Sequence, residues 1–148
     1  GFFRNKTKAV QGACRALVLG HGGEVPADMD ALVKLPGVGR KTANVVLGVW
    51  YKRPAIIVDT HLSRVTQRLG LTHETDPDKI ETELRRIVPE ARWTEFSHGI
   101  GFHGRRVCKA RKPECEACRI SRWCDYFAAL RKETAARGKR QDRPTAKR

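Results

Sequence analysis

The sequence contains no apolar run that approaches the ~20 residues needed to span a bilayer. Its first six residues are not followed by the apolar core of a signal peptide, so we expect neither a single-pass membrane protein nor a secreted precursor. Acidic residues are scarce, with 16 Asp and Glu against 30 Lys and Arg, which gives a net charge of +14. This imbalance favours a polyanionic partner, most plausibly nucleic acid, although a ribosomal or chromatin protein would share it.

Cysteines are also few, and their placement is uneven. Cys14 stands alone in an apolar helical pattern, where we expect a buried core thiol. The other four crowd together near the end of the chain, at Cys108, Cys115, Cys118 and Cys124. A secreted disulfide framework would spread its cysteines and usually have an even number. The pattern instead predicts four thiolates around one metal centre in a reducing compartment, with zinc and an iron–sulfur cluster both open.

Helical periodicity dominates the rest of the 148-residue sequence. Glycine and proline punctuation predicts helices over residues 4–19, 26–35, 40–50, 60–69, 76–88 and around 93–100. In the first of these helices we expect Val10 and Val18 to face the core. Residues 55–58 are compatible with a short strand but are better interpreted as leading into a helix capped by Asp59. From residue 134 on, basic residues without periodicity predict disorder.

A Leu-Pro-Gly-Val-Gly turn at residues 35–39 connects the second and third predicted helices. Gly37 and Gly39 permit positive φ and the close approach of another backbone. The helix that starts here would direct free N–H groups and the positive end of its dipole at an anion. A DNA phosphate suits that position, with contacts from Gly37, Val38, Gly39 and Arg40. An ordinary corner between two helices would use the same glycines for geometry alone.

A longer match surrounds this turn. Residues 35–47 read Leu-Pro-Gly-Val-Gly-Arg-Lys-Thr-Ala-Asn-Val-Val-Leu, and residues 58–65 read Val-Asp-Thr-His-Leu-Ser-Arg-Val. Together they resemble the endonuclease III family, whose members are DNA glycosylases and abasic-site lyases of the helix-hairpin-helix superfamily. The resemblance implies an all-α fold, with a helical barrel domain and an iron–sulfur cluster domain.

On this resemblance, the barrel domain covers residues 1–104 and contains the helix-hairpin-helix at about 27–50. The cluster loop covers residues 105–130, and a basic disordered tail covers 131–148. The match corresponds only to the later two-thirds of the family. We therefore expect the family's N-terminal helices, which close the barrel and wedge into DNA, to lie upstream of this sequence.

The resemblance also assigns the chemistry. It makes Lys41 the nucleophile and Asp59 its partner, and it suggests that the carbonyls of Val33, Leu35 and Val38 hold a monovalent cation. Independently, an attacking amine must be neutral, which a partly desolvated place near a helix N-terminus favours. A carboxylate can stabilise the cationic sugar that forms as a base leaves. The plainer alternatives are an exposed surface lysine and a helix cap.

For the four clustered cysteines, the resemblance selects a structural [4Fe–4S] cluster over zinc. The loop between the first two of them carries Lys109, Arg111 and Lys112, which we expect to contact DNA phosphates rather than only solvent.

The implied function is removal of oxidised pyrimidines from double-stranded DNA through a lysine Schiff base, followed by strand nicking through β-elimination. We expect a monomer in a bacterial-type cytoplasm. One alternative is a monofunctional mismatch glycosylase, although those relatives generally lack the lysine. Another is a non-catalytic DNA-binding module.

Overall fold

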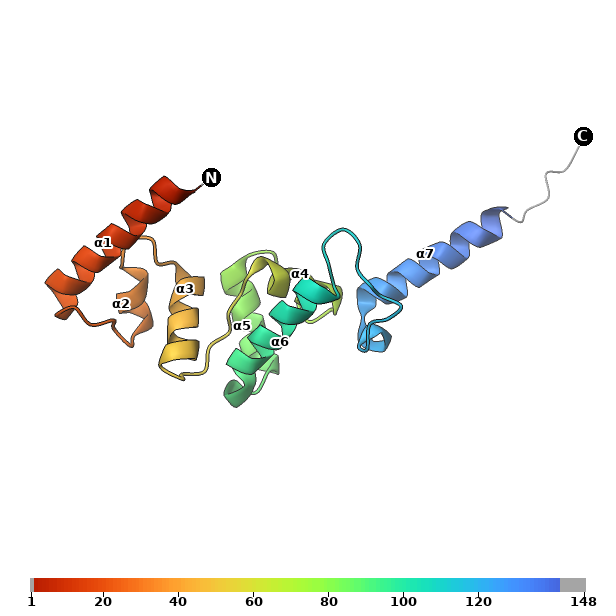
Figure 1. Ribbon diagram of the computed structural model, residues 1–148. Coiled ribbons are helices and arrows are strands. Elements are labelled where there is room, and N and C mark those ends of the chain that lie inside the picture. The colour runs from red at the N-terminus through yellow and green to blue at the C-terminus, as the bar shows by residue number, and fades with distance from the viewer. Residues whose placement is uncertain (1, 142–148) are drawn as a thin grey trace, which may run out of the picture.

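The computed structural model describes residues 2–141, and within that range every regular element is a helix (Figure 1). The elements are α1 (Phe3–His21), α2 (Met29–Val33), α3 (Arg40–Val45), η1 (Val46–Trp50), α4 (Thr60–Arg68), α5 (Pro77–Ile87), η2 (Glu90–Arg92), α6 (Trp93–Arg106), η3 (Ser121–Trp123) and α7 (Asp125–Gln141). The all-α prediction is confirmed for this part of the chain. None of these helices is both long and apolar enough to cross a membrane.

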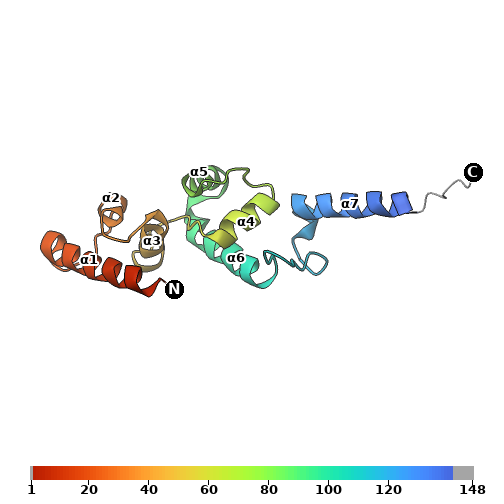
Figure 2. The same cartoon turned by 90° about the horizontal axis from the view of Figure 1, so that it is seen from above.

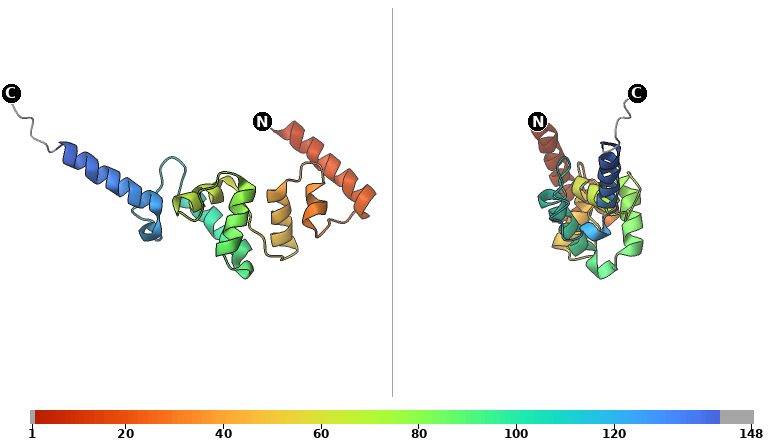
Figure 3. Two further views of the ribbon diagram at one scale, coloured as in Figure 1. Left: turned by 180° about the vertical axis from the view of Figure 1, so that it is seen from behind. Right: turned by 90° about the vertical axis from the view of Figure 1, so that its right-hand side faces the viewer.

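The helices follow one another along an elongated molecule (Figures 1 and 2). α1, α2 and α3 lie together at one end, and α4, α5 and α6 form the middle. α7 extends from the other end, and the view from behind shows the same order (Figure 3). The turn between α2 and α3 and the loop before α7 therefore lie in different parts of the molecule.

A first hydrophobic cluster holds the hairpin end together. Leu32 of α2 and Leu35 of the turn pack with Ala43 and Leu47 from α3 and η1, and all are buried. Leu17 of α1 covers this cluster. Burial of each large aliphatic side chain contributes about 1.5–3 kcal/mol, so this cluster stabilises the otherwise short helices α2 and α3.

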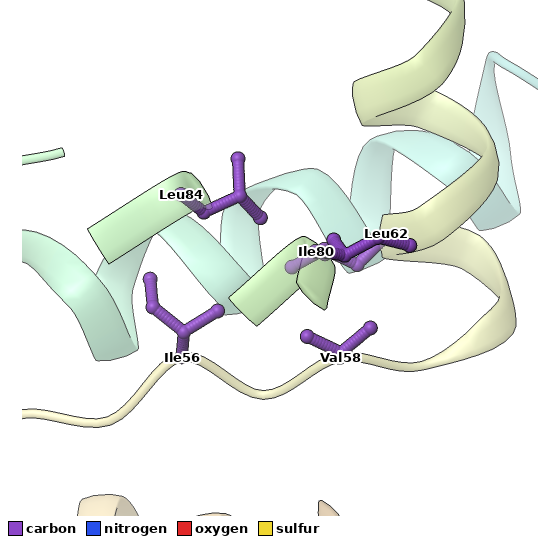
Figure 4. Packing of buried hydrophobic residues seen from close by; sticks show 5 residues of the cluster. All are labelled: Ile56, Val58, Leu62, Ile80 and Leu84. Carbon is purple, nitrogen blue, oxygen red and sulfur yellow. The ribbon is translucent and has the colours of Figure 1, made fainter. Parts of the chain in front are cut away.

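A second cluster forms the middle of the molecule (Figure 4). Ile56 and Val58, on the extended segment before α4, point toward Leu62 of α4 and toward Ile80 and Leu84 of α5. The partly buried aromatic face of α6 packs against the same group. Residues 55–58 are buried without forming a strand, which agrees with their interpretation as a lead into the next helix.

Capping residues set several helix starts. Asp59 and Asp76 accept hydrogen bonds from the first turns of α4 and α5, as the sequence predicts for the first of them. α2 differs from expectation, because it begins at Met29 with Asp28 as its cap rather than near Pro26. The side chain of Asp28 accepts the N–H of Ala31, and this cap fixes the later start.

Two expectations for α1 are wrong. Val10 and Val18 are 62 % and 65 % exposed, and Cys14 is exposed rather than buried. The packed face of α1 instead includes Gly12, where a Cβ would lie 2.9 Å from Pro36. A face of small residues lets the turn approach the helix, and this turns the larger side chains outward.

The end of the chain also differs from expectation. α7 continues through Gln141, so residues 131–141 of the predicted disordered tail are helical. Strong helix formers such as Ala, Lys and Arg sustain a helix without a buried face. The remainder of the predicted tail, residues 142–148, lies outside the described range.

Candidate active site and cysteine loop

The turn before α3 uses its two glycines differently. Gly37 has φ 75°, and a Cβ there would overlap the Cβ of Ala9 on α1. Gly39 has φ −91°, so it does not use the positive φ that glycine permits. A Cβ at Gly39 would meet no atom within 4 Å. Gly37 therefore fits the turn to α1, whereas Gly39 leaves open space in front of α3.

Gly39 is the N-cap of α3, and no side chain caps this helix. The first N–H groups of a helix have no partner within it, so this end offers donors to an anion. Val38 is half-buried, and its N–H donates to the carbonyl of Leu35 at 3.0 Å. The cation site predicted at the carbonyls of Val33, Leu35 and Val38 stays a prediction.

Lys41 and Asp59 line the same hollow, although they lie on either side of the turn that follows η1. The hollow lies between α3 and α6 and has a cavity volume of about 280 Å³. Lys41 is exposed, which corrects the expectation that its side chain is partly desolvated. The placement of the two predicted catalytic residues in one hollow is the main geometric feature of this site.

The carboxylate of Asp59 has two separate surroundings. Its Oδ1 accepts the N–H of Leu62 at 2.7 Å, as an N-cap does. Its Oδ2 lies 3.6 Å from Nη2 of Arg105 on α6, and the side chain is 18 % exposed. The capping role and a role in the hollow therefore coexist in one residue.

Other side chains around the hollow come mainly from α6. His98 and Phe102 are exposed and line it together with Arg105. The guanidinium of Arg105 lies 5.9 Å from the ring of Phe102.

His61, within the second motif, does not line this hollow. Its Nδ1 lies 3.2 Å from Nη2 of Arg64.

Arg40, which the sequence predicts to contact DNA, is occupied inside the protein. Its Nε and Nη2 donate to the two carboxylate oxygens of Glu81 at 2.8 and 3.0 Å. This hydrogen-bonded pairing raises the pKa of Arg40. The side chain of Arg40 is still 42 % exposed, and the contact of this residue with DNA stays a prediction.

The four clustered cysteines are free thiols, and they line one hollow beside α4 and α6. Burial raises the pKa of Cys115, and the nearby thiol groups of Cys108, Cys124 and Cys118 raise it further. Burial also lowers the pKa of His103, whose Nε2 lies 3.7 Å from Sγ of Cys118.

Two arginines of α4 hold the start of this cysteine loop. Arg64 donates to the carbonyls of Gly104 and Cys108 at 2.8 and 3.1 Å. Arg68 donates from Nη1 to Sγ of Cys108 at 3.2 Å and to the carbonyl of Lys109 at 2.9 Å. The loop is therefore attached to the helix that Asp59 caps.

Among residues 2–141, no three His, Cys, Asp or Glu side chains converge closely enough to hold one metal ion. The thiols of Cys108, Cys115, Cys118 and Cys124 nevertheless line one hollow, and they are the residues that would hold a metal centre. The iron–sulfur cluster predicted there stays a prediction.

The basic residues of the loop differ in their surroundings. Lys109 forms an ion pair with Glu114, with Nζ 2.6 Å from Oε1. Arg111 and Lys112 are exposed. The predicted phosphate contacts at these three residues stay predictions.

Sequence reasoning missed Glu81 and Arg105. Glu81 follows Ile80 and lies near Leu84 on the inward face of α5. An acidic residue among inward-facing apolar residues indicates a buried carboxylate that needs a partner, and this signal could have identified Glu81. Arg105 gave no such signal, because its place beside Asp59 depends on how α4 and α6 cross. Gly104 allows this crossing, since a Cβ there would lie 2.9 Å from His61.

Similarity to known proteins covers most of the chain. The model of the HhH-GPD superfamily of base excision DNA repair proteins matches residues 1–90. The chain is 53 % identical over 125 residues to endonuclease III of Synechocystis sp., covering 84 % of this chain and 57 % of the relative. It is 42 % identical over 126 residues to endonuclease III of Escherichia coli, covering 85 % and 60 %. The chain thus spans 57–60 % of the length of these curated relatives.

Solved structures agree with this similarity. A trapped covalent intermediate of an endonuclease III with DNA, an estranged-adenine complex, aligns with a TM-score of 0.84 at 42 % identity. The alignment covers 88 % of this chain and 62 % of that one. A thermostable thymine-DNA glycosylase aligns with a TM-score of 0.77 at 27 % identity, covering 87 % and 61 %.

Proposed function

Because this chain belongs to the HhH-GPD superfamily of base excision DNA repair proteins, we propose that it is a DNA glycosylase with abasic-site lyase activity. Its substrate is double-stranded DNA that carries an oxidised pyrimidine or an abasic site. The observation that carries the proposal is the hollow shared by Lys41 and Asp59. A relative that was trapped in a covalent intermediate with DNA supports it.

In the proposed reaction, the target nucleotide leaves the base stack and enters the hollow. The neutral amine of Lys41 attacks C1′ of the sugar, and the bond between C1′ and the base breaks with its electron pair leaving on the base. The base then takes up a proton. Asp59, negatively charged beside the sugar, stabilises the positive charge that develops during this step.

Strand cleavage follows from the same intermediate. The lone pair on the Lys41 nitrogen forms a protonated Schiff base with C1′ as the C1′–O4′ bond breaks, and O4′ takes up a proton. The Schiff base makes a proton on C2′ acidic. Loss of that proton allows the C3′–O bond to break, and the phosphate leaves with the electron pair. Water then hydrolyses the Schiff base, releases the sugar fragment as an aldehyde and restores the amine of Lys41.

DNA itself would supply the desolvation that the free protein lacks at Lys41. The open space at Gly39 and the uncapped start of α3 suit a phosphate next to this lysine. A duplex lying over the turn would cover the hollow and exclude water from it. We infer that Lys41 becomes reactive in the complex rather than in the free chain.

The four clustered cysteines would hold a [4Fe–4S] cluster with a structural role. All four ligands come from the protein, so no open position remains for substrate. This chain's own residues connect that loop to the rest of the site. Arg64 and Arg68 attach it to α4, and the presentation of Arg111 and Lys112 to DNA depends on its shape.

Borohydride trapping on abasic-site DNA tests the function directly. Reduction of the Schiff base should cross-link the protein to DNA, and Lys41→Gln should abolish the cross-link while leaving DNA affinity within about threefold. Lys79→Gln is the matched control, because Lys79 lies on α5, is exposed and should not affect trapping.

The same assay separates the alternatives. Equal trapping by Lys41→Gln would contradict the assignment of the nucleophile. Base release without any cross-link would indicate a monofunctional mismatch glycosylase that uses water. DNA binding with neither base release nor cross-link would indicate a non-catalytic module.

A further inference from the structure

Glu81 is a buried carboxylate that joins two helices. Its side chain is 3 % exposed, and its carboxylate accepts three hydrogen bonds and forms a further ion pair with Arg85. Oε2 accepts Nε of Arg40 at 2.8 Å and Nδ2 of Asn44 at 3.0 Å. Oε1 accepts Nη2 of Arg40 at 3.0 Å and lies 2.8 Å from Nη2 of Arg85. The donors from Arg40 and Asn44 connect α5 to α3, and only the one from Arg85 stays within α5.

The position of these donors along α3 matters for Lys41. Arg40 and Asn44 are four residues apart, so they lie on one face of the helix, and Lys41 lies between them on a different face. Holding that face against α5 fixes both the rotation of α3 and the direction in which Lys41 points. The paired donation by the planar guanidinium is the most direction-dependent of these interactions.

Lys41 and Asp59 depend on different hydrophobic clusters. Lys41 is on α3, which packs in the cluster of Leu32 and Leu35, whereas Asp59 caps α4, which packs in the cluster of Ile56 and Leu62. Packing within each cluster cannot by itself set the distance between the two residues. Interactions between the clusters must do so.

One such interaction lies at the far end of the helix. A Cβ at Gly48 in η1 would lie 3.0 Å from Oγ1 of Thr94, and that oxygen accepts the N–H of Ala55 at 3.2 Å. This close approach fixes the last turn but not the first. Without a second attachment, the start of α3 could pivot about η1.

We propose that Glu81 is a positioning residue, which anchors the start of α3 through Arg40 and Asn44 and thereby holds Lys41 toward Asp59. The proposal rests on the function proposed above. It concerns the rate of Schiff-base formation rather than the affinity for DNA, since Glu81 is buried and does not face the hollow. It also assigns to Arg40 an internal role in place of a side-chain contact with DNA.

The test compares three variants of the 148-residue chain. Glu81→Gln removes the charge of the acceptor, and Arg40→Lys keeps the positive charge but loses the two fixed donors. Both should slow single-turnover borohydride trapping at saturating DNA by at least about tenfold, while the dissociation constant changes by less than threefold. Arg40→Lys keeps Glu81 paired with Asn44 and Arg85, so it carries the test if Glu81→Gln fails to fold.

Arg85→Gln is the matched control, because it removes a donor from the same carboxylate without touching α3. It should lower the melting temperature but keep the trapping rate within twofold. A rate in Arg40→Lys equal to the wild type would overturn the proposal. Equal slowing by Arg85→Gln and Arg40→Lys, each fully folded, would overturn it too, because the effect would then follow from stability alone.

Amide hydrogen exchange tests the anchoring of α3 without requiring catalysis. Amides of α3 should exchange faster in Glu81→Gln and Arg40→Lys and remain protected in Arg85→Gln. Unchanged protection in the first two variants would contradict the anchor. Absence of trapping in the wild type, by contrast, would contradict the proposed function and leave the anchor to be judged by this exchange alone.

Discussion

The carboxylate of Asp59 combines a structural role with the chemical role that we propose for it. One oxygen caps α4 through the N–H of Leu62, and the other lies in the hollow near Arg105. The two roles call for different properties. Capping requires only an acceptor oxygen, which Asn also supplies, whereas stabilising a cationic sugar requires the negative charge.

Asp59→Asn should therefore separate the two roles. We expect the free energy of unfolding to change by less than about 1 kcal/mol, because Asn caps helices about as well as Asp. The single-turnover rate of base release should fall about 10²-fold, the scale of losing one preorganised electrostatic group. Chemical denaturation and rapid-quench kinetics measure the two quantities.

Asp76→Asn provides the matched control for that change. Asp76 caps α5 with its Oδ1 and does not line the hollow with Lys41, so neither rate nor stability should change greatly. If Asp59→Asn lowered stability and left the rate intact, capping would be its whole role.

At the residue scale, the sequence predicted that Lys41 and Asp59 belong to one site, but it did not predict the surroundings of these residues. The motifs around Lys41 and Asp59 carried a family resemblance, and the structure brings both residues to one hollow. The exposure of Lys41 and the pairing of Arg40 with Glu81 could not be predicted from the motif. Both depend on the packing of α3 against α5, two helices far apart in the sequence.

At the scale of elements, the turn between α2 and α3 makes opposite demands on its two glycines. Gly37→Ala should destabilise the chain by more than about 1 kcal/mol, because alanine at positive φ is strained and its methyl group would overlap Ala9. Thermal or chemical denaturation measures this change. We expect the DNA affinity of the molecules that remain folded to fall only to the extent that the strain displaces the turn.

Gly39→Ala should show the reverse. Nothing lies near its Cβ position and its φ is −91°, so thermal stability should change little. A methyl group there would stand in the way of a phosphate at the start of α3, and we expect binding to abasic-site DNA to weaken at least about tenfold. Full affinity in this variant would place the phosphate elsewhere.

The cysteine loop leads to a prediction of the metal content of the purified protein. Protein prepared anaerobically with ample iron should be yellow-brown and contain about four irons per chain. Cys115→Ser should reduce the iron content and the DNA affinity, whereas Cys14→Ser should change neither, because Cys14 is exposed on α1 away from the loop. One zinc per chain with no iron would contradict the cluster.

The elements themselves were largely predictable where local signals act. Asp76 and Pro77 start α5 as expected, and Gly22, in a left-handed conformation, ends α1. The error in the orientation of α1 arose because tertiary packing decides which face of this helix is buried. The inward face of α1 is set by the close approach of Pro36 to Gly12. The spacing of apolar residues along the helix does not reveal this contact.

At the scale of the whole molecule, the net charge of +14 should make DNA affinity depend on salt concentration. Removing one cation that pairs with a DNA phosphate should make the slope of log affinity against log salt concentration shallower by about 0.9. The double variant Arg111→Gln and Lys112→Gln should therefore reduce the slope by about 1.8. The double variant Arg131→Gln and Lys132→Gln on α7 removes the same charge and should reduce the slope less. An equal reduction would show that the cations of the cysteine loop have no special part in DNA binding.

Lys41 and Asp59 are attached to different hydrophobic clusters, so we expect the proposed activity to respond to partial unfolding. If one cluster loses its packing while the other keeps its helices, the two side chains separate. Borohydride trapping should then cease at the denaturant concentration that loosens the weaker cluster, before helical circular dichroism reports loss of the whole chain. Substitutions that stabilise the weaker cluster should therefore preserve the proposed activity under stress.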